Sequence, residues 1–427
     1  MILEKKISHL KILVIAIFFF ASYSNAGQES AASQFSFVKA SKPSSLFVDK
    51  PYSSEQGYGF DLNTQINNQG NPFYFSTKVS EGNYRITVEF GHSRRASSNT
   101  VKAESRRLFL QDVKTLPGKF TTRSFTANVR NSALADHRED SPTSEKVLLK
   151  TTEAGSLNWD DKLTLEFDGA APQVRSIRIE KVDVPTLFLI GDSTVTDQPY
   201  EPAASWGQML PRFFKDEVAV ANHAESGETM KAFIMELRLA KVLETIKKDD
   251  YLFIQFGHND QKQQWQQTYA DAETTYKDYL KVLIAEARLR GATPVVITSM
   301  QRRNFDQNGK IQNTHGNYPE AVREVAKEMK VALIDLEAMS IKLYEALGPD
   351  KAPLAFNDYG KDKTHHNNYG AYELAKCVVQ GIRDANLAVA SKLLDKLPIY
   401  DPANPDPVEI FTLSQIPIKS QTKPAGN

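Results

Sequence analysis

Two patterns of hydrophobic and polar positions divide the chain near residue 185. Before it, apolar and polar residues alternate one by one in several short runs, such as residues 84–90 and 162–167. A period of two is typical of β-strands that bury one face. Turn residues separate these runs, and no long helical pattern comes between them. We therefore expect residues 27–184 to form an all-β sandwich.

After residue 185, short and almost entirely apolar runs alternate with stretches of helical period. Strands buried on both faces have such sequences, and they occur in parallel sheets covered by helices. The expected strands are 186–190, 218–221, 251–256, 294–298 and 331–335. The expected helices are 205–214, 231–246, 271–290, 318–329 and 368–386. This pattern predicts an α/β domain over residues 185–397, a three-layer α/β/α sandwich with a five-stranded parallel sheet, followed by a proline-rich tail at 398–427 that wraps or frays.

The first 26 residues have the three parts of a secretory signal peptide. Basic residues come first, an apolar run follows at residues 12–23, and small residues at 24–26 offer a cleavage site. The apolar run is short for a membrane-spanning helix. We expect an exported protein, periplasmic or secreted, with no stable membrane insertion after cleavage. An uncleaved membrane anchor is the alternative.

Composition narrows the function further. The 52 basic and 52 acidic residues balance, and no basic patch is interleaved with aromatic residues, so we expect no nucleic-acid partner. Cys377 is the only cysteine, which excludes an internal disulfide and a cysteine cluster for zinc. Metalloprotease and P-loop motifs are absent too. We expect no metal and no organic cofactor, and the sequence leaves the oligomeric state open.

Polar motifs follow the first three expected strands of the α/β domain. Functional residues gather at the carboxyl ends of strands in such sheets. Ser193 follows the first strand, Gly227 the second and Asn259 the third. A serine there is a candidate nucleophile, although serine also caps helices and turns. Gly227 and Asn259 are candidate N–H donors to an oxyanion, although both residue types also serve turns.

A serine hydroxyl is a poor nucleophile at neutral pH and needs a base to accept its proton. Asp362 and His365 stand three residues apart before the last expected helix. On a turn, that spacing can bring a carboxylate against an imidazole, which it orients. The alternative is that Asp362 caps the helix and His365 is an ordinary surface residue. His366 is a competing candidate for the base.

Taken together, the motifs Gly191-Asp192-Ser193, Gly257-His258-Asn259-Asp260 and Asp362-Lys363-Thr364-His365 resemble the SGNH, or GDSL-type, hydrolase superfamily. The resemblance implies the flavodoxin-like fold of that superfamily. It implies that Ser193 is the nucleophile, that His365 is the base and that Asp362 is the acid of the triad. The spacing favours His365 over His366. The implied oxyanion hole consists of the N–H groups of Ser193 and Gly227 and the amide of Asn259.

Within this superfamily the motifs most resemble rhamnogalacturonan acetylesterases, and the β region resembles a galactose-binding-like sandwich. This implies a carbohydrate esterase that removes O-acetyl groups from pectic plant cell-wall polysaccharide or oligosaccharide through an acyl-enzyme. The alternatives are an acetylxylan or other glycan acetylesterase, a GDSL lipase or lysophospholipase, and a non-enzymatic glycan-binding protein. One departure is that those esterases often carry a basic residue after the second-motif glycine, where this chain has Glu228.

Overall fold

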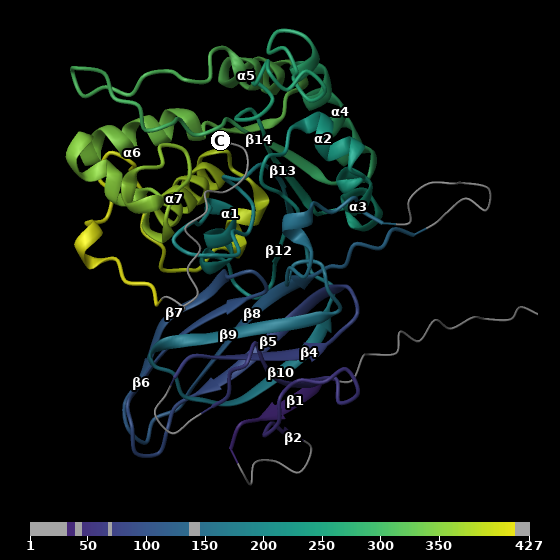
Figure 1. Cartoon of the computed structure of the whole chain (residues 1–427), viewed down its shortest axis with the longest axis vertical. Helices are drawn as coiled ribbons and strands as arrows, with labels where there is room; N and C mark the ends of the chain where they lie inside the picture. The colour runs from purple at the N-terminus through teal and green to yellow at the C-terminus, as the bar shows by residue number, and fades with distance from the viewer. Residues whose placement is uncertain (1–31, 39–44, 67–70, 136–145, 415–427) are drawn as a thin grey trace, which may run out of the picture. The chain divides into compact units, whose positions relative to one another are not determined.

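The computed structural model describes residues 32–38, 45–66, 71–135 and 146–414 (Figure 1). The expected signal peptide at residues 1–26 lies outside this set, as does the end of the tail from residue 415 onward. The chain from Ala32 onward forms one compact unit. Among the described helices, none combines the length and the apolar character needed to cross a bilayer.

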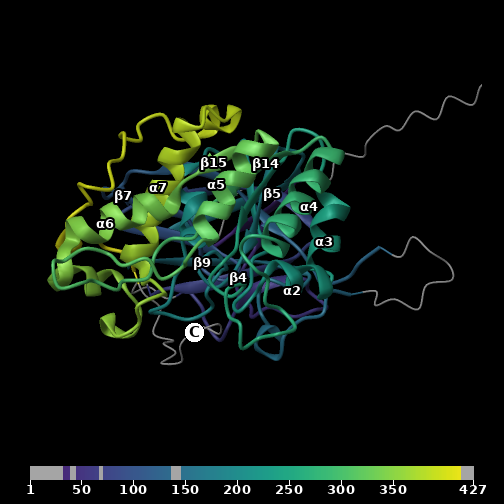
Figure 2. The ribbon, with the colours of Figure 1, turned by 90° about the horizontal axis from the view of Figure 1, so that it is seen from above.

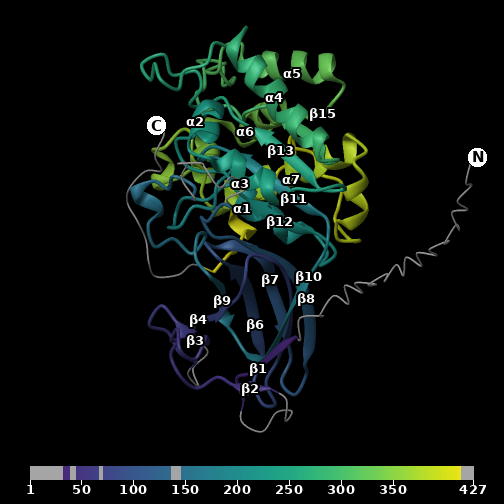
Figure 3. The same ribbon diagram turned by 90° about the vertical axis from the view of Figure 1, so that its right-hand side faces the viewer.

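The strands before residue 185 form two layers (Figure 3). Aromatic and aliphatic side chains form a hydrophobic core between them. One layer has the order β3-β4-β9-β6-β7, and the other contains β8-β5-β10-β1-β2. The strands are β1 (Ser33–Ser36), β2 (Leu46–Phe47), β3 (Tyr58–Asp61), β4 (Phe73–Lys78), β5 (Gly82–Phe90), β6 (Ser97–Ala103), β7 (Arg107–Thr115), β8 (Thr121–Val129), β9 (Lys162–Ala171) and β10 (Val174–Val182). In β5 the predicted alternation buries Ile86 and Val88 and leaves Thr87 partly exposed. The N-terminal region is therefore rich in β-structure, as the alternation predicts.

All five strands predicted after residue 185 are present, and their ends differ from the prediction by no more than one residue. They are β11 (Thr186–Gly191), β12 (Ala219–Asn222), β13 (Tyr251–Gln255), β14 (Thr293–Ile297) and β15 (Ala332–Ile334). They pair in parallel in the order β15-β14-β13-β11-β12. Leu187 and Leu189 face one hydrophobic core, whereas Phe188 and Ile190 face the other. This explains the continuous apolar sequences.

Helices cover both faces of these strands, with α6 and α7 on one side and α3 and α4 on the other (Figures 1 and 2). The α-helices are α1 (Trp206–Met209), α2 (Met230–Met235), α3 (Arg238–Thr245), α4 (Thr275–Leu289), α5 (Tyr318–Met329), α6 (Leu336–Lys351) and α7 (Asn368–Asp384). The 3-10 helices are η1 (Thr151–Glu153), η2 (Leu210–Phe213), η3 (Ala352–Ala355), η4 (Asp358–Gly360), η5 (Ala388–Lys392) and η6 (Val408–Ile410).

Two predicted helices are interrupted in the structure, and one helix was not predicted. The helix expected at 205–214 is α1 followed by η2, where Pro211 lacks the N–H that a continuing α-helix needs. The helix expected at 231–246 is two helices, because Leu237 between them has a φ of 62°. Helix α6 was not predicted. Its apolar residues are not concentrated on one face, and Gly348 with a φ of 69° precedes Pro349 inside it.

The five predicted parallel strands are present, but they do not form a sheet of their own. Strand β12 pairs with β8 of the β region through Val220 and Ala127, so ten strands form one mixed sheet. Buried Arg107 fastens this junction, because its Nη1 donates to the carbonyls of Asn128 (3.0 Å) and Val220 (3.3 Å). Its Nε pairs with the carboxylate of Asp197 at 2.9 Å. Hydrophobic periodicity predicts which face of a strand is buried, but it does not predict which other strand pairs with it.

The described part of the tail wraps along α7. The Tyr400 hydroxyl donates to the carboxylate of Glu373 at 2.8 Å, and the Tyr369 hydroxyl donates to the carbonyl of Asp406 at 2.7 Å. Further along, the carbonyl of Thr412 accepts from the Gln111 side chain of β7 at 2.9 Å. Between residues 398 and 414, therefore, the tail wraps rather than frays.

Candidate active site

Ser193 stands just beyond β11, at the carboxyl edge of the parallel strands. The neighbouring strand β13 passes so close to Gly191 that a Cβ there would lie 2.5 Å from the carbonyl oxygen of Gln255. The following turn is fixed by Asp192, whose carboxylate accepts from the backbone N–H (3.0 Å) and the hydroxyl (2.8 Å) of Thr194. Glycine and aspartate thus place Ser193 at the rim of the sheet.

The loop before α7 brings His365 against this serine. Its Nε2 lies 2.8 Å from Oγ of Ser193, and its Nδ1 lies 2.9 Å from Oδ2 of Asp362. The other oxygen of Asp362 accepts from the backbone N–H groups of Thr364 (2.8 Å) and His365 (3.0 Å). The three side chains are buried. The structure therefore brings together the serine, histidine and aspartate that the sequence singled out.

The surroundings of Asp362 favour its ionised form. Burial by itself raises the pKa of a carboxyl group, but the hydrogen bond and charge interaction with His365 and the two backbone N–H donors outweigh it. The pKa of Asp362 therefore lies well below its ordinary value. A carboxylate at neutral pH can orient the imidazole and stabilise it when it is protonated.

The competing base His366 faces the interior instead. Its Nε2 lies 2.8 Å from the hydroxyl of Tyr344, and its ring packs 4.3 Å from the ring of Phe356. Burial and the neighbouring His365 lower the pKa of His366 to about 3. His366 is therefore a neutral core residue. The side chain of His365 points the other way, toward Ser193.

Gly227 and Asn259 lie on loops beside Ser193. Strands β12 and β13 flank β11 in the sheet, so the loops that follow them meet at one edge. Gly227 has a φ of 79°, a conformation that glycine adopts without strain. The Asn259 amide donates to the carbonyl of Glu228 at 3.0 Å, which ties the two loops together. An amide nitrogen carries a second N–H, which remains to serve another acceptor.

Sequence reasoning missed several residues that support this arrangement. Asp192 and His258 are both buried and lie 3.2 Å apart, joining the first and second motif loops. The Gln198 amide donates to the carbonyl of Ser193 at 2.7 Å. Lys150, from the β region, reaches the loop around Gly227 at the carbonyl of Ser226. The motifs contain the first pair, but no local signal marks Gln198 or Lys150.

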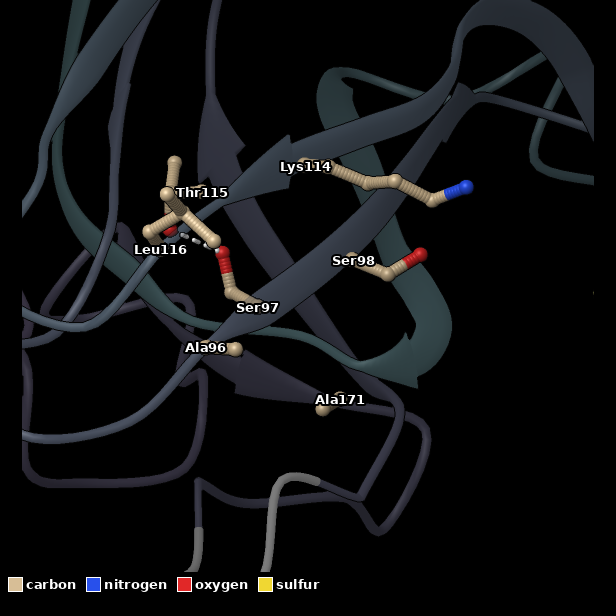
Figure 4. Close-up of a pocket in the computed structure, with 7 residues that line it drawn as sticks. All are labelled: Ala96, Ser97, Ser98, Lys114, Thr115, Leu116 and Ala171. Carbon is tan, nitrogen blue, oxygen red and sulfur yellow. Dashed lines mark hydrogen bonds between the residues drawn. The ribbon is translucent and has the colours of Figure 1, made fainter.

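A separate pocket of about 360 Å³ lies at the ends of β6 and β7 (Figure 4). It is lined by Ala96, Ser97, Ser98, Lys114, Thr115, Leu116 and Ala171. The hydroxyls of Ser97 and Thr115 bond each other at 2.7 Å, and Lys114 pairs with Asp112 at 2.6 Å. None of the predicted site residues lines this pocket. Among the described residues, no group of three His, Cys, Asp or Glu side chains is arranged to hold a metal ion.

Several known proteins resemble this chain. It is 42% identical over 223 residues to the rhamnogalacturonan acetylesterase RhgT of Bacillus subtilis, covering 49% of this chain and 94% of the relative. It is 37% identical over 217 residues to the probable rhamnogalacturonan acetylesterase YesY of the same organism, covering 49% and 97%. A crystal structure of the B. subtilis protein YxiM aligns at 23% identity and a TM-score of 0.48, covering 84% of this chain and 99% of that one.

Residues 189–372 match the GDSL-like Lipase/Acylhydrolase family. That segment contains all five predicted site residues, Ser193, Gly227, Asn259, Asp362 and His365. The alignments cover 94% of RhgT and 97% of YesY, at 42% and 37% identity. The predicted membership of the GDSL-type superfamily is thus confirmed. The chain belongs to the GDSL-like lipase/acylhydrolase family and is a carboxylic ester hydrolase.

Proposed function

We propose that this esterase is a carbohydrate acetylesterase that removes O-acetyl groups from a pectic polysaccharide of the rhamnogalacturonan type. The activity printed in the names of the two Bacillus relatives, at 42% and 37% identity, supports this substrate class. The observation that carries the chemistry is the chain of contacts from Ser193 through His365 to Asp362, at 2.8 and 2.9 Å.

In the proposed first step, Ser193 attacks the acetyl carbonyl carbon. Nε2 of His365 accepts the proton of the hydroxyl as Oγ forms its bond to carbon, and the carbonyl π electrons move to oxygen. Asp362 stabilises the imidazolium that results, from 2.9 Å away at Nδ1. The product of this step is a tetrahedral intermediate with one negative oxygen.

The negative oxygen of that intermediate needs fixed N–H donors. We assign this role to the backbone N–H groups of Ser193 and Gly227 and to the side-chain amide of Asn259. Such donors act most strongly on the charge that develops in the transition state. The placement of the three residues on the loops after β11, β12 and β13 supports the assignment.

The intermediate then breaks the bond between the acetyl carbon and the sugar oxygen. The imidazolium of His365 gives its proton to that oxygen, so the sugar hydroxyl leaves and the acetyl group stays on Ser193. A water molecule then attacks the acyl carbon while His365 accepts its proton. The bond between that carbon and Oγ of Ser193 breaks, the imidazolium returns the proton to Oγ, and acetic acid leaves. The sum is one ester and one water converted to one alcohol and one acetic acid, with the enzyme restored.

The experiment that tests this function measures acetate released from acetylated rhamnogalacturonan, with acetylated xylan and a long-chain 4-nitrophenyl ester as comparisons. We expect release from the pectic polymer and none from Ser193→Ala, whose circular dichroism should match that of the wild type. Lys363→Ala, an exposed position beside the site, is the matched control and should keep full activity. Full activity in Ser193→Ala would contradict the site assignment.

The comparison substrates decide between the alternatives. Serine-dependent release from xylan alone would keep the mechanism and overturn the pectic substrate. Preference for the long-chain ester would favour a lipase. Absence of release from every ester would overturn the enzymatic proposal and favour a glycan-binding protein.

We further propose that the protein is exported to the periplasm or the medium. The support is the sequence of residues 1–26, with its basic start, apolar run and small residues before Gly27. N-terminal sequencing of the protein recovered from the periplasm and the medium of its native host should give a chain that starts at Gly27. A protein that keeps Met1 and sediments with membranes would contradict the proposal.

A further inference from the structure

The loop that carries Gly227 is held from the β region by one lysine. Lys150 lies between β8 and β9, immediately before η1. Its Nζ donates to the carbonyl of Ser226 at 2.6 Å and forms an ion pair with the carboxylate of Glu228. One cation thus contacts the residues on both sides of Gly227, from a segment 76 residues away in the chain.

The contact matters for the loop because the carboxylate of Glu228 is buried and needs a cation close to it. The other cationic neighbour of this carboxylate, Nε of Arg238, is 3.8 Å away. Arg238 is engaged elsewhere, because its two terminal nitrogens donate to the carboxylate of Glu153 at 3.0 and 2.5 Å. Glu153 in turn accepts from the backbone N–H of Lys150 at 2.8 Å. Lys150 is therefore the closest cation to the Glu228 carboxylate.

The backbone of Glu228 connects the same loop to the other oxyanion donor. Its carbonyl accepts from the amide of Asn259 at 3.0 Å, and the next residue, Thr229, caps α2 by accepting from Ala232 at 3.0 Å. Burial raises the pKa of Glu228 to about 7, against the opposing charges of Lys150 and Arg238. Without Lys150 the side-chain carboxylate of Glu228 would have to take up a proton or move. A movement of Glu228 would also shift its backbone carbonyl, which is the acceptor for the Asn259 amide.

We propose that Lys150 is a positioning residue of the esterase, which holds residues 226–228 so that the N–H of Gly227 and the amide of Asn259 face the same oxygen atom. The inference rests on the proposed function, because it takes those two groups as the oxyanion donors. Lys150 acts through the loop and touches no reacting atom. The β region is then part of the catalytic apparatus, whatever its affinity for sugar.

The test uses the full chain and 4-nitrophenyl acetate, so that it depends on ester cleavage and not on the identity of the glycan. In Lys150→Met we expect kcat to fall about tenfold or more while KM changes less than about threefold, because a displaced donor weakens transition-state binding more than substrate binding. Lys150→Arg keeps a cation within reach of Ser226 and Glu228 and should recover most of the lost kcat.

Two further variants separate positioning from general damage. Lys162→Met removes another lysine of the β region, paired with Asp61 at 2.8 Å, and should leave kcat unchanged. The double variant Lys150→Met/Glu228→Gln removes both charges, so it avoids an unpaired buried carboxylate and should fold even if Lys150→Met does not. It should still be slow, because the carbonyl of Ser226 has lost its donor.

The outcomes distinguish this inference from the function on which it rests. Wild-type kcat in folded Lys150→Met, or in the folded double variant, would overturn the role of Lys150 while leaving the esterase intact. An equal loss of kcat in Lys162→Met would overturn it too, because the effect would then be unspecific. A wild-type enzyme that cleaves no acetyl ester would instead remove the proposed function, and this inference with it.

Discussion

At the scale of single residues, the site depends on side chains whose charge state is set by their partners. Asp362 is kept ionised by His365 and by two backbone N–H groups, while His366 one position later is kept neutral by burial. Adjacent histidines thus have opposite environments, one facing a hydroxyl and a carboxylate and the other facing Tyr344 and Phe356. The environments differ because the two side chains point in different directions from the loop, His365 toward Ser193 and His366 toward Tyr344.

Asn259→Ala tests the oxyanion assignment. We expect kcat to fall by about 10²–10³, the loss typical of removing one oxyanion donor, with a smaller change in KM. Steady-state kinetics with 4-nitrophenyl acetate measures both parameters, and thermal unfolding checks that the variant is folded. A change confined to KM would mean that the amide binds substrate without stabilising the transition state.

Asp362 also contributes to stability in a way that depends on pH. Its pKa is lowered on folding from an ordinary value of 3.8, so the native state gains stability that is present above that value and is lost as pH falls toward the lower, native pKa. Denaturant titrations of the wild type and Asp362→Asn should show a gap in the free energy of unfolding that narrows below about pH 4. A gap independent of pH would contradict the ionised carboxylate.

At the scale of elements, the ends of β11, β12 and β13 each place one candidate site residue, Ser193, Gly227 and Asn259, whereas Asp362 and His365 come from the loop before α7. The sequence predicts β11 to β15 well, since buried parallel strands are distinctly apolar. It does not show that Leu237 divides a helix or that α6 exists. Helix α6 depends on contacts that override the local pattern, because it packs against α7 although its apolar residues are spread around it.

Gly191→Ala tests the packing of β11 against β13. The added methyl group would lie 2.5 Å from the carbonyl oxygen of Gln255, so one of the two strands must shift. We expect a loss of about 1–3 kcal/mol in the free energy of unfolding and a reduced kcat, because Ser193 is two residues away. Chemical denaturation and the 4-nitrophenyl acetate assay measure the two effects. Unchanged stability would show that the strands have room to adjust.

At the scale of the whole molecule, the β region and the α/β part share one sheet and are joined by ion pairs between them. Arg107 of β7 pairs with Asp197, which follows β11, and Lys150 pairs with Glu228, which follows β12. In both pairs the carboxylate belongs to a segment that also carries a candidate site residue, Ser193 or Gly227. The tail adds another link, since Thr412 accepts from Gln111 of β7.

Arg107→Met tests the junction at this scale. The change leaves the buried carboxylate of Asp197 without its cation, and we expect a loss of about 3–5 kcal/mol in the free energy of unfolding. Adding Asp197→Asn should restore part of it, because the unpaired charge is then gone. Both are measured by denaturant unfolding of the full chain. An unaffected Arg107→Met would mean that the junction does not depend on this pair.

The sequence by itself determined the strands of the α/β part, the β-rich character of the first half and the residues of the candidate site. Apolar periodicity reports burial directly, and the first two motifs stand where strands end while the third precedes the last helix. Only the tertiary structure decided that β12 pairs with β8 and that Lys150 contacts the loop around Gly227. These depend on edges, side-chain directions and contacts between distant segments, and a local pattern carries no information about them.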